Sequence, residues 1–209
     1  MSSHRRLALV AGILYLVTFA TSIPALALKT PLLTGVADAD DPGVRVAIVL
    51  ELLLALSCVG TALAVLPVTR RVSEPLALGF LASRIVEAGL VMTGAAALVA
   101  LTAEESPALV AIHDAAFLLG PGILPAVNAV LLGTVLWRAR LVPRIIPLVG
   151  LIGAPLLLLS ALGTLFGLVD QVSPLAGLAA LPIALWEFTI GVWLVVRGFR
   201  PEAVARLGA

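Results

Sequence analysis

Six ionisable side chains occur inside long apolar stretches of the sequence, where an isolated charge is costly. Four are carboxylic acids and two are bases: Glu51, Glu87, Asp114, Glu187, Arg84 and His113. One charged side chain at the centre of a membrane helix costs about 2.5 to 3.5 kcal/mol on insertion scales, so such residues usually have a partner or a function. Carboxyl groups beside a histidine supply general acid and base catalysis, and they equally supply proton-coupled transport.

The charge balance among these side chains predicts incomplete ionisation. Four acids face one permanent cation, Arg84, and one optional cation, His113. Because buried like charges oppose one another's ionisation, we expect one or two carboxyls to hold a proton near neutral pH. Alternatively, a hard cation could balance them in an oxygen-rich site. A single intramembrane histidine disfavours zinc, and with no cofactor motif in the chain we expect neither a bound metal nor a cofactor.

The composition predicts that the whole chain is a membrane protein. Of its 209 residues, 61% are hydrophobic and 12% are charged, and the mean hydropathy is +1.18. Soluble domains carry about 25% charged residues, twice this fraction. The balance of 13 basic and 12 acidic residues gives no reason to expect a nucleic-acid partner, and the single cysteine, Cys58, excludes a disulfide within the chain.

The apolar stretches predict six membrane-spanning helices in one all-α domain over residues 1–209. A bilayer core about 30 Å thick needs roughly 20 apolar residues in helix, and an unpaired backbone cannot face lipid. Four stretches begin at a proline, which suits a first helical turn. We expect the fourth helix to be broken or kinked near Gly120-Pro121-Gly122. The expected spans are 7–28, 44–68, 75–101, 107–137, 143–169 and 174–199.

The arginines predict the orientation. Basic residues precede the first span, follow the last, and occupy the second and fourth connections, whereas acids occupy the other connections. The positive-inside rule then places both termini in the cytoplasm. A cleaved signal sequence is an alternative interpretation of the first span. Against it, Tyr15, Thr18 and Ser22 form a polar stripe at helical spacing, which favours packing against other helices.

Depth along the predicted helices places the ionisable residues in one shared cluster. At 1.5 Å per residue, Glu51 and the His113-Asp114 pair lie about 10 Å below the outer surface, with Glu87 and Glu187 near the midplane. Asp114, Pro121 and Asn128 recur every seven residues, and Trp186 adjoins Glu187. We therefore predict four catalytic residues, namely Glu87, Glu187, Asp114 and His113, and five ligand-binding residues, namely Arg84, Glu51, Asn128, Trp186 and Tyr15.

Structural explanations compete with each of these assignments. Arg84 and Glu87 are three residues apart and could form an ion pair within one helix that only lowers the insertion cost. The glycines near Pro121 could mark a simple kink whose backbone groups are satisfied by neighbouring helices. Gly163 and Gly167 form a G-x-x-x-G pair that predicts either close packing within the chain or a homodimer.

Four short segments resemble a group of small bacterial integral membrane proteins known only as a domain of unknown function. The segments are Arg6-Leu-Ala-Leu-Val-Ala-Gly12-Ile-Leu-Tyr15-Leu16, Arg84-Ile-Val-Glu87, His113-Asp114-Ala-Ala-Phe117 and Pro143-Arg144. The likeness extends over nearly the whole chain. It implies a helical protein of a bacterial cytoplasmic membrane, with Arg84, Glu87, His113 and Asp114 among its marked positions, and it implies no known activity.

Three functional hypotheses remain open from the sequence. The first is a membrane protein that binds a hydrophobic molecule of lipid or isoprenoid type and acts on it by acid and base chemistry. The second is a proton-coupled transporter of a small solute. The third is a structural or regulatory membrane partner without chemistry. A ligand-sized cavity open to lipid favours the first, a water-filled vestibule from one face the second, and a solid core the third.

Overall fold

A computed structural model describes residues 3–36, 38 and 40–207 of the chain. In this part of the chain all regular structure is helical, and six helical stretches are long and apolar enough to cross a membrane. This confirms the prediction of a multi-pass helical bundle. The helices are α1 (Ser3–Leu33), α2 (Pro42–Thr69), α3 (Glu74–Leu101), α4 (Pro107–Leu119), α5 (Leu124–Ala139), α6 (Ile145–Leu165), α7 (Pro174–Val196) and α8 (Pro201–Arg206).

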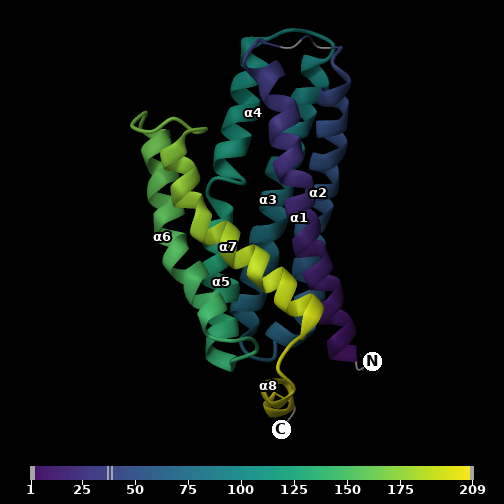
Figure 1. The fold of residues 1–209 in the computed structure, drawn as a ribbon, viewed down its shortest axis with the longest axis vertical. Helices are drawn as coiled ribbons and strands as arrows, with labels where there is room; N and C mark the ends of the chain where they lie inside the picture. Colours follow the sequence, from purple (N-terminus) through teal and green to yellow (C-terminus); the bar gives the residue numbers. More distant parts are fainter. Residues whose placement is uncertain (1–2, 37, 39, 208–209) are drawn as a thin grey trace.

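The helices α1, α2, α3, α5, α6 and α7 form a closed ring, and α4 packs on α3. α1 contacts α2, α2 contacts α3, and α3 contacts both halves of the broken fourth span, α4 and α5. α5 then packs against α6, α6 against α7, and α7 returns to α1. Both ends of the chain lie at the same end of the bundle (Figure 1). The chain therefore runs along the bundle an even number of times. The cytoplasmic placement of the end with the termini stays a prediction.

The fourth span is broken where the glycines and proline predicted it. α4 ends at Leu119 and α5 begins at Leu124. A Cβ atom on Gly122 would lie 2.3 Å from the carbonyl oxygen of Leu118, so the backbone there requires glycine. Pro121 lies between the two glycines and contributes no N–H to a helix. As a result, α4 and α5 are separate helices, and residues 114 and 128 do not share one continuous helix face.

Helix ends differ from the expected spans in two informative places. α1 continues to Leu33, five residues beyond its expected end, and so includes Lys29. α6 ends at Leu165 instead of residue 169, because Gly167 adopts a left-handed turn with φ of 69°. Gly163 and Gly167 therefore do not lie together on one face of α6 as expected, and the homodimer stays a prediction.

The helix α7 packs closely on α6 and on α1 in the half of the bundle that contains the termini. There α1 approaches α7 so closely that a Cβ on Gly12 would lie 2.7 Å from the backbone of Gly191, and Gly150 of α6 lies against the Trp186 ring of α7. The larger cluster of buried apolar residues includes Trp186 and Leu194. At the opposite end, α6 and α7 lean away from α1 and α4 (Figure 1). The bundle is therefore solid at one end and divided at the other.

Candidate functional site

Arg84 is the centre of a buried polar cluster that joins several helices. Its guanidinium donates through Nη1 to Glu87 Oε2 at 3.0 Å and through Nη2 to Glu187 Oε1 at 2.7 Å. Glu87 is one turn further along α3, whereas Glu187 belongs to α7. The side chain of Arg84 is 2% exposed. The planar guanidinium can hold two carboxylates at once, which a lysine ammonium does with less geometric control.

Neighbouring helices hold this cluster in place. Asn128 of α5 donates through Nδ2 to Glu87 Oε2 at 2.7 Å, so that oxygen accepts two hydrogen bonds. Arg84 Nη1 also lies 3.6 Å from Cys58 Sγ of α2. The Tyr15 ring of α1 lies 5.3 Å from the guanidinium carbon, close enough for a cation–π contact. Side chains from α1, α2, α3, α5 and α7 thus converge on one arginine.

The charges of the Arg84 cluster do not cancel when both carboxyls are ionised. One guanidinium faces two carboxylates, which leaves a net negative charge. Glu87 is enclosed, with 6% of its side chain exposed, while 13% of the Glu187 side chain is exposed. Glu187 is therefore the carboxyl of the pair that a ligand or a proton reaches more easily.

A second polar cluster lies in the half of the bundle away from the termini. Lys29 of α1 forms a buried ion pair with Glu51 of α2, and its ammonium lies 4.7 Å from the ring centre of Phe117. His113 of α4 stacks on the same Phe117 ring with a centre-to-centre distance of 6.3 Å. Its Nδ1 lies 3.1 Å from Asp114 Oδ1. This second cluster thus joins α1, α2 and α4.

Lys29 is the functional candidate that the sequence interpretation missed. Because the first span was ended at Leu28, the lysine was left outside the membrane and Arg84 was counted as the only permanent cation. The polar stripe of Tyr15 and Ser22 reaches Lys29 after seven further residues, and this spacing was the available signal. With Lys29 included, the excess of carboxyl groups over permanent cations is two instead of three.

The structure separates some residues that were expected to lie together. The ionisable residues form two clusters at two depths and not one. Asp114 faces outward, with 53% of its side chain exposed, because its neighbour His113 occupies the inward face of α4 and adjacent helix residues point about 100° apart. Its backbone oxygen accepts a hydrogen bond of 3.1 Å from Gln171, in the connection before α7.

The expected ligand-binding residues divide into two groups. Arg84 and Glu51 line pockets. Asn128, Tyr15 and Trp186 are fully buried and line none of the pockets described here. Asn128 contacts Glu87, and Tyr15 contacts Arg84, each on the side away from the pockets. Trp186 packs on Gly150.

Three adjoining pockets, together called the central cleft below, connect the two polar clusters. A pocket of about 260 Å³ is lined by Arg84, Glu87 and Glu187 together with mostly apolar side chains. A smaller pocket of about 50 Å³ is lined by Lys29, Glu51 and His113. The third pocket has a volume of about 220 Å³. Pro121, at the helix break, lines all three, so the break in the fourth span is where the pockets meet.

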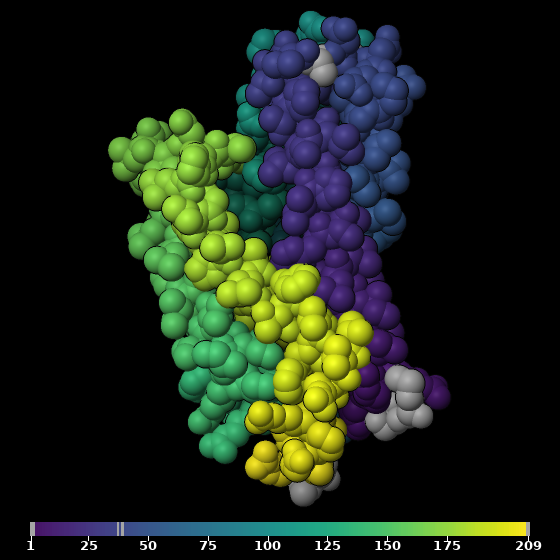
Figure 2. All heavy atoms as spheres, in the orientation of Figure 1, coloured from purple at the N-terminus to yellow at the C-terminus, as the bar shows by residue number. Residues whose placement is uncertain are grey.

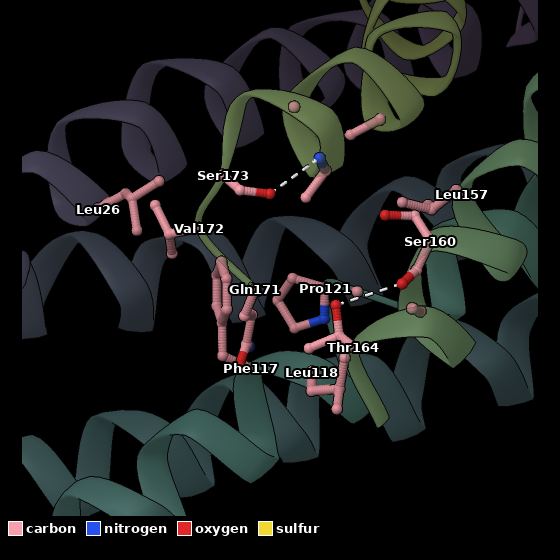
Figure 3. A pocket seen from close by; sticks show the side chains of 15 residues that line it. Leu26, Phe117, Leu118, Pro121, Leu157, Ser160, Thr164, Gln171, Val172 and Ser173 are labelled. Atoms are coloured by element: carbon pink, nitrogen blue, oxygen red, sulfur yellow. Dashed lines mark hydrogen bonds between the residues drawn. The ribbon is translucent and has the colours of Figure 1, made fainter. Parts of the chain in front are cut away.

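The third pocket is the apolar side of the central cleft. Its walls are α4, α6 and the start of α7, with Phe117, Leu118 and Leu157 among the side chains that face it (Figure 3). Two of its hydroxyl groups are engaged locally, since Thr164 donates to the Ser160 carbonyl and Ser173 caps α7. Figure 2 shows the molecule hollowed between α1 and the upper parts of α6 and α7. The cleft thus opens along the side of the bundle, within the length of the spans.

The arrangement offers acid, base and ion-pairing groups in an apolar setting. Among the described residues, no group of three or more histidine, cysteine, aspartate and glutamate side chains is placed to hold a metal ion. The carboxyl of Glu187 and the imidazole of His113 both face the cleft.

Comparison with known proteins gives one match. The family model described as a domain of unknown function (DUF4386) matches residues 10–198. The chain belongs to this family, which confirms the resemblance noted from its motifs. No curated protein and no solved structure matches the chain.

Proposed function

We propose that this member of the DUF4386 family binds a hydrophobic small molecule of lipid or isoprenoid type in the central cleft and acts on it by general acid and base chemistry. The proposal rests chiefly on one observation: the partly exposed Glu187 carboxyl, paired with Arg84, forms one wall of a pocket of about 260 Å³ that is otherwise largely apolar. Ligand sites generally combine an apolar lining with a few placed polar groups.

The shape of the cleft supports entry of the ligand from the bilayer. Its apolar side lies between α4 and α6 and opens at the side of the bundle. A hydrophobic tail can occupy this side at little cost in hydrogen bonds, because the Thr164 and Ser173 hydroxyls are already bonded to neighbouring backbone groups. The polar end of the molecule then meets Arg84 and Glu187.

Each polar residue has a distinct proposed role. Glu187 acts as the general acid, since it is the more exposed carboxyl of a cluster with excess negative charge. Arg84 holds and orients the Glu187 carboxyl through its Nη2 hydrogen bond. Glu87, held by Arg84 and Asn128, is a positioning residue. His113 serves as base from the smaller pocket, with Asp114 fixing its ring.

A proton-coupled transporter is the second candidate, and the Lys29–Glu51 pair favours it. Two ionisable clusters at different depths face pockets that share Ser22, Leu54 and Pro121 as lining residues. Such a series of titratable groups is typical of proton pathways. The transporter predicts proton flux into proteoliposomes that Glu51→Gln and Glu187→Gln both abolish, whereas the enzyme predicts no such flux.

The bacterial cytoplasmic membrane is the proposed location. The resemblance of the motifs supports a bacterial membrane, and the arginines at the end with both termini support a cytoplasmic position for that end. Membrane lipids are then the nearest source of a hydrophobic ligand.

The experiment uses purified protein and a total lipid extract of the expression host as the probe. Hydrophobic molecules that co-purify, and those converted during incubation, are identified by liquid chromatography with mass spectrometry. Gly177→Leu places a side chain at the apolar side of the cleft, where a Cβ meets nothing within 4 Å. We expect this variant to retain at least tenfold less of the co-purified molecule.

Two further variants make the result specific. Gly89→Leu is the matched control, because Gly89 of α3 also has open space around its Cβ position and lines none of the described pockets. It should retain the molecule as the native chain does. Glu187→Gln should bind but convert the substrate at least ~100-fold more slowly, the usual contribution of an acid or base. Equal retention by both glycine variants contradicts binding in the cleft, and unchanged conversion by Glu187→Gln across the pH range contradicts the acid role.

A further inference from the structure

A large basic pocket lies at the end of the bundle that holds both termini, far along the helices from the central cleft. It has a volume of about 590 Å³. Basic side chains reach it from the start of α1, from the connection between α2 and α3, and from the end of α7. They are His4, Arg5, Arg71 and Arg197. Among residues 3–36, 38 and 40–207 no acidic side chain lines it, and its remaining walls are apolar groups that include Phe199 and Val204.

Two arginines of this pocket, Arg71 and Arg197, form no ion pair with a carboxylate of the described residues. Arg5 is fixed by its guanidinium, which donates to the carbonyl oxygens of Leu194 at 2.9 Å and Val195 at 2.6 Å. The guanidinium groups of Arg71 and Arg197 line one pocket and repel each other, so an anion bound between them would relieve that repulsion.

We propose that this basic pocket binds a phosphate-bearing group, with the head group of an anionic phospholipid as its favoured source. Guanidinium groups match phosphate oxygens with paired hydrogen bonds. The pocket lies at the start of the span α1 and the end of the span α7, and the ends of spans are expected at the level of lipid head groups, where basic pockets recognise such lipids. The apolar wall at Phe199 and Val204 gives the glycerol and upper chain of a lipid a surface to contact.

The experiment measures thermal unfolding of the full chain in nanodiscs or detergent with two probes. The pocket variant is Arg71→Gln with Arg197→Gln. The control is Arg70→Gln with Arg138→Gln, which removes the same charge from exposed positions at the same end but outside the pocket. Phosphatidylglycerol, added against a phosphatidylcholine background, should raise the Tm of the native chain and of the control. In the pocket variant its apparent affinity should fall about tenfold or more.

A second probe separates the two sources of phosphate. Inorganic phosphate in lipid-free detergent should leave the native Tm unchanged if the lipid is the ligand. If phosphate alone raises the Tm of the native chain and not that of the pocket variant, the site is a phosphate site but the lipid assignment is overturned. Equal effects of phosphatidylglycerol on the two variants, or no effect on the native chain, overturn the site itself. Circular dichroism before heating checks that both variants are folded.

Discussion

Arg84 of α3 and Glu187 of α7 are joined by a hydrogen-bonded ion pair of 2.7 Å at the wall of the central cleft. The two residues are 103 positions apart in the chain. The pair is therefore a tertiary link between neighbouring walls of the cleft, and not only a means of lowering the insertion cost of a single helix. The intrahelical contact of Arg84 with Glu87 exists beside it.

The first prediction concerns the stability that Arg84 provides. Arg84→Gln leaves Glu87 and Glu187 without their cation and should lower the free energy of unfolding by about 3–5 kcal/mol, as for a buried pair that loses one partner. Glu187→Gln leaves Arg84 paired with Glu87 and should cost only about 1–2 kcal/mol. Unfolding in mixed detergent micelles measures both. A double variant whose loss equals the sum of the two single losses would argue against their coupling.

The second prediction concerns the Lys29–Glu51 pair. Both side chains are buried, so Lys29→Met should destabilise the protein by about 3–5 kcal/mol by leaving a lone carboxylate. Combining it with Glu51→Gln removes both charges and should recover most of that loss. The same unfolding assay applies. If Lys29→Met alone has no effect, the lysine head group is solvated and the buried pair does not exist.

The third prediction tests the tight packing of α6 on α7. A Cβ on Gly150 would lie 2.6 Å from the Trp186 ring, so Gly150→Ala should cost about 1–3 kcal/mol through overpacking. Gly177→Ala is the control, since its Cβ meets nothing within 4 Å, and it should be neutral or slightly stabilising. Equal Tm values for the two variants would show that the two helices are further apart than described.

The fourth prediction concerns orientation. Glu74→Cys and Glu104→Cys place single exposed thiols at opposite ends of α3, and native Cys58 is buried. A membrane-impermeant maleimide should label Glu104→Cys in intact cells, and Glu74→Cys only in inside-out vesicles, as the arginine distribution predicts. The reverse pattern would invert the assigned topology without altering the fold.

Depth along a helix was readable from the sequence, whereas the direction of each side chain was not. Counting residues placed Glu87 and Glu187 at one level and Glu51 and His113 at another, and the structure brings each set to a common cluster. Asp114 shares the depth of His113 yet faces outward. Rotation about the helix axis depends on packing partners, which hydropathy does not identify.

The predicted helix boundaries decided which charged residues were counted as lying inside the membrane. The glycines and proline at 120–122 predicted the break correctly, because their backbone requirements are local. Lys29 was not counted among the membrane charges because the predicted span ended at Leu28, directly before it, whereas α1 continues to Leu33. The lysine is tolerated inside the bundle only through Glu51 and the Phe117 ring, and both partners belong to other helices. A sequence window along α1 alone does not contain that information.

Ligand density in the central cleft is the most direct test of the account. An experimental map of the protein in lipid nanodiscs should show an elongated non-protein feature between α4 and α7, with one end within hydrogen-bond distance of the Glu187 carboxyl. A map in which α4 packs directly on α6 and α7, with lipid only on the outer surface of the bundle, would contradict the proposed function.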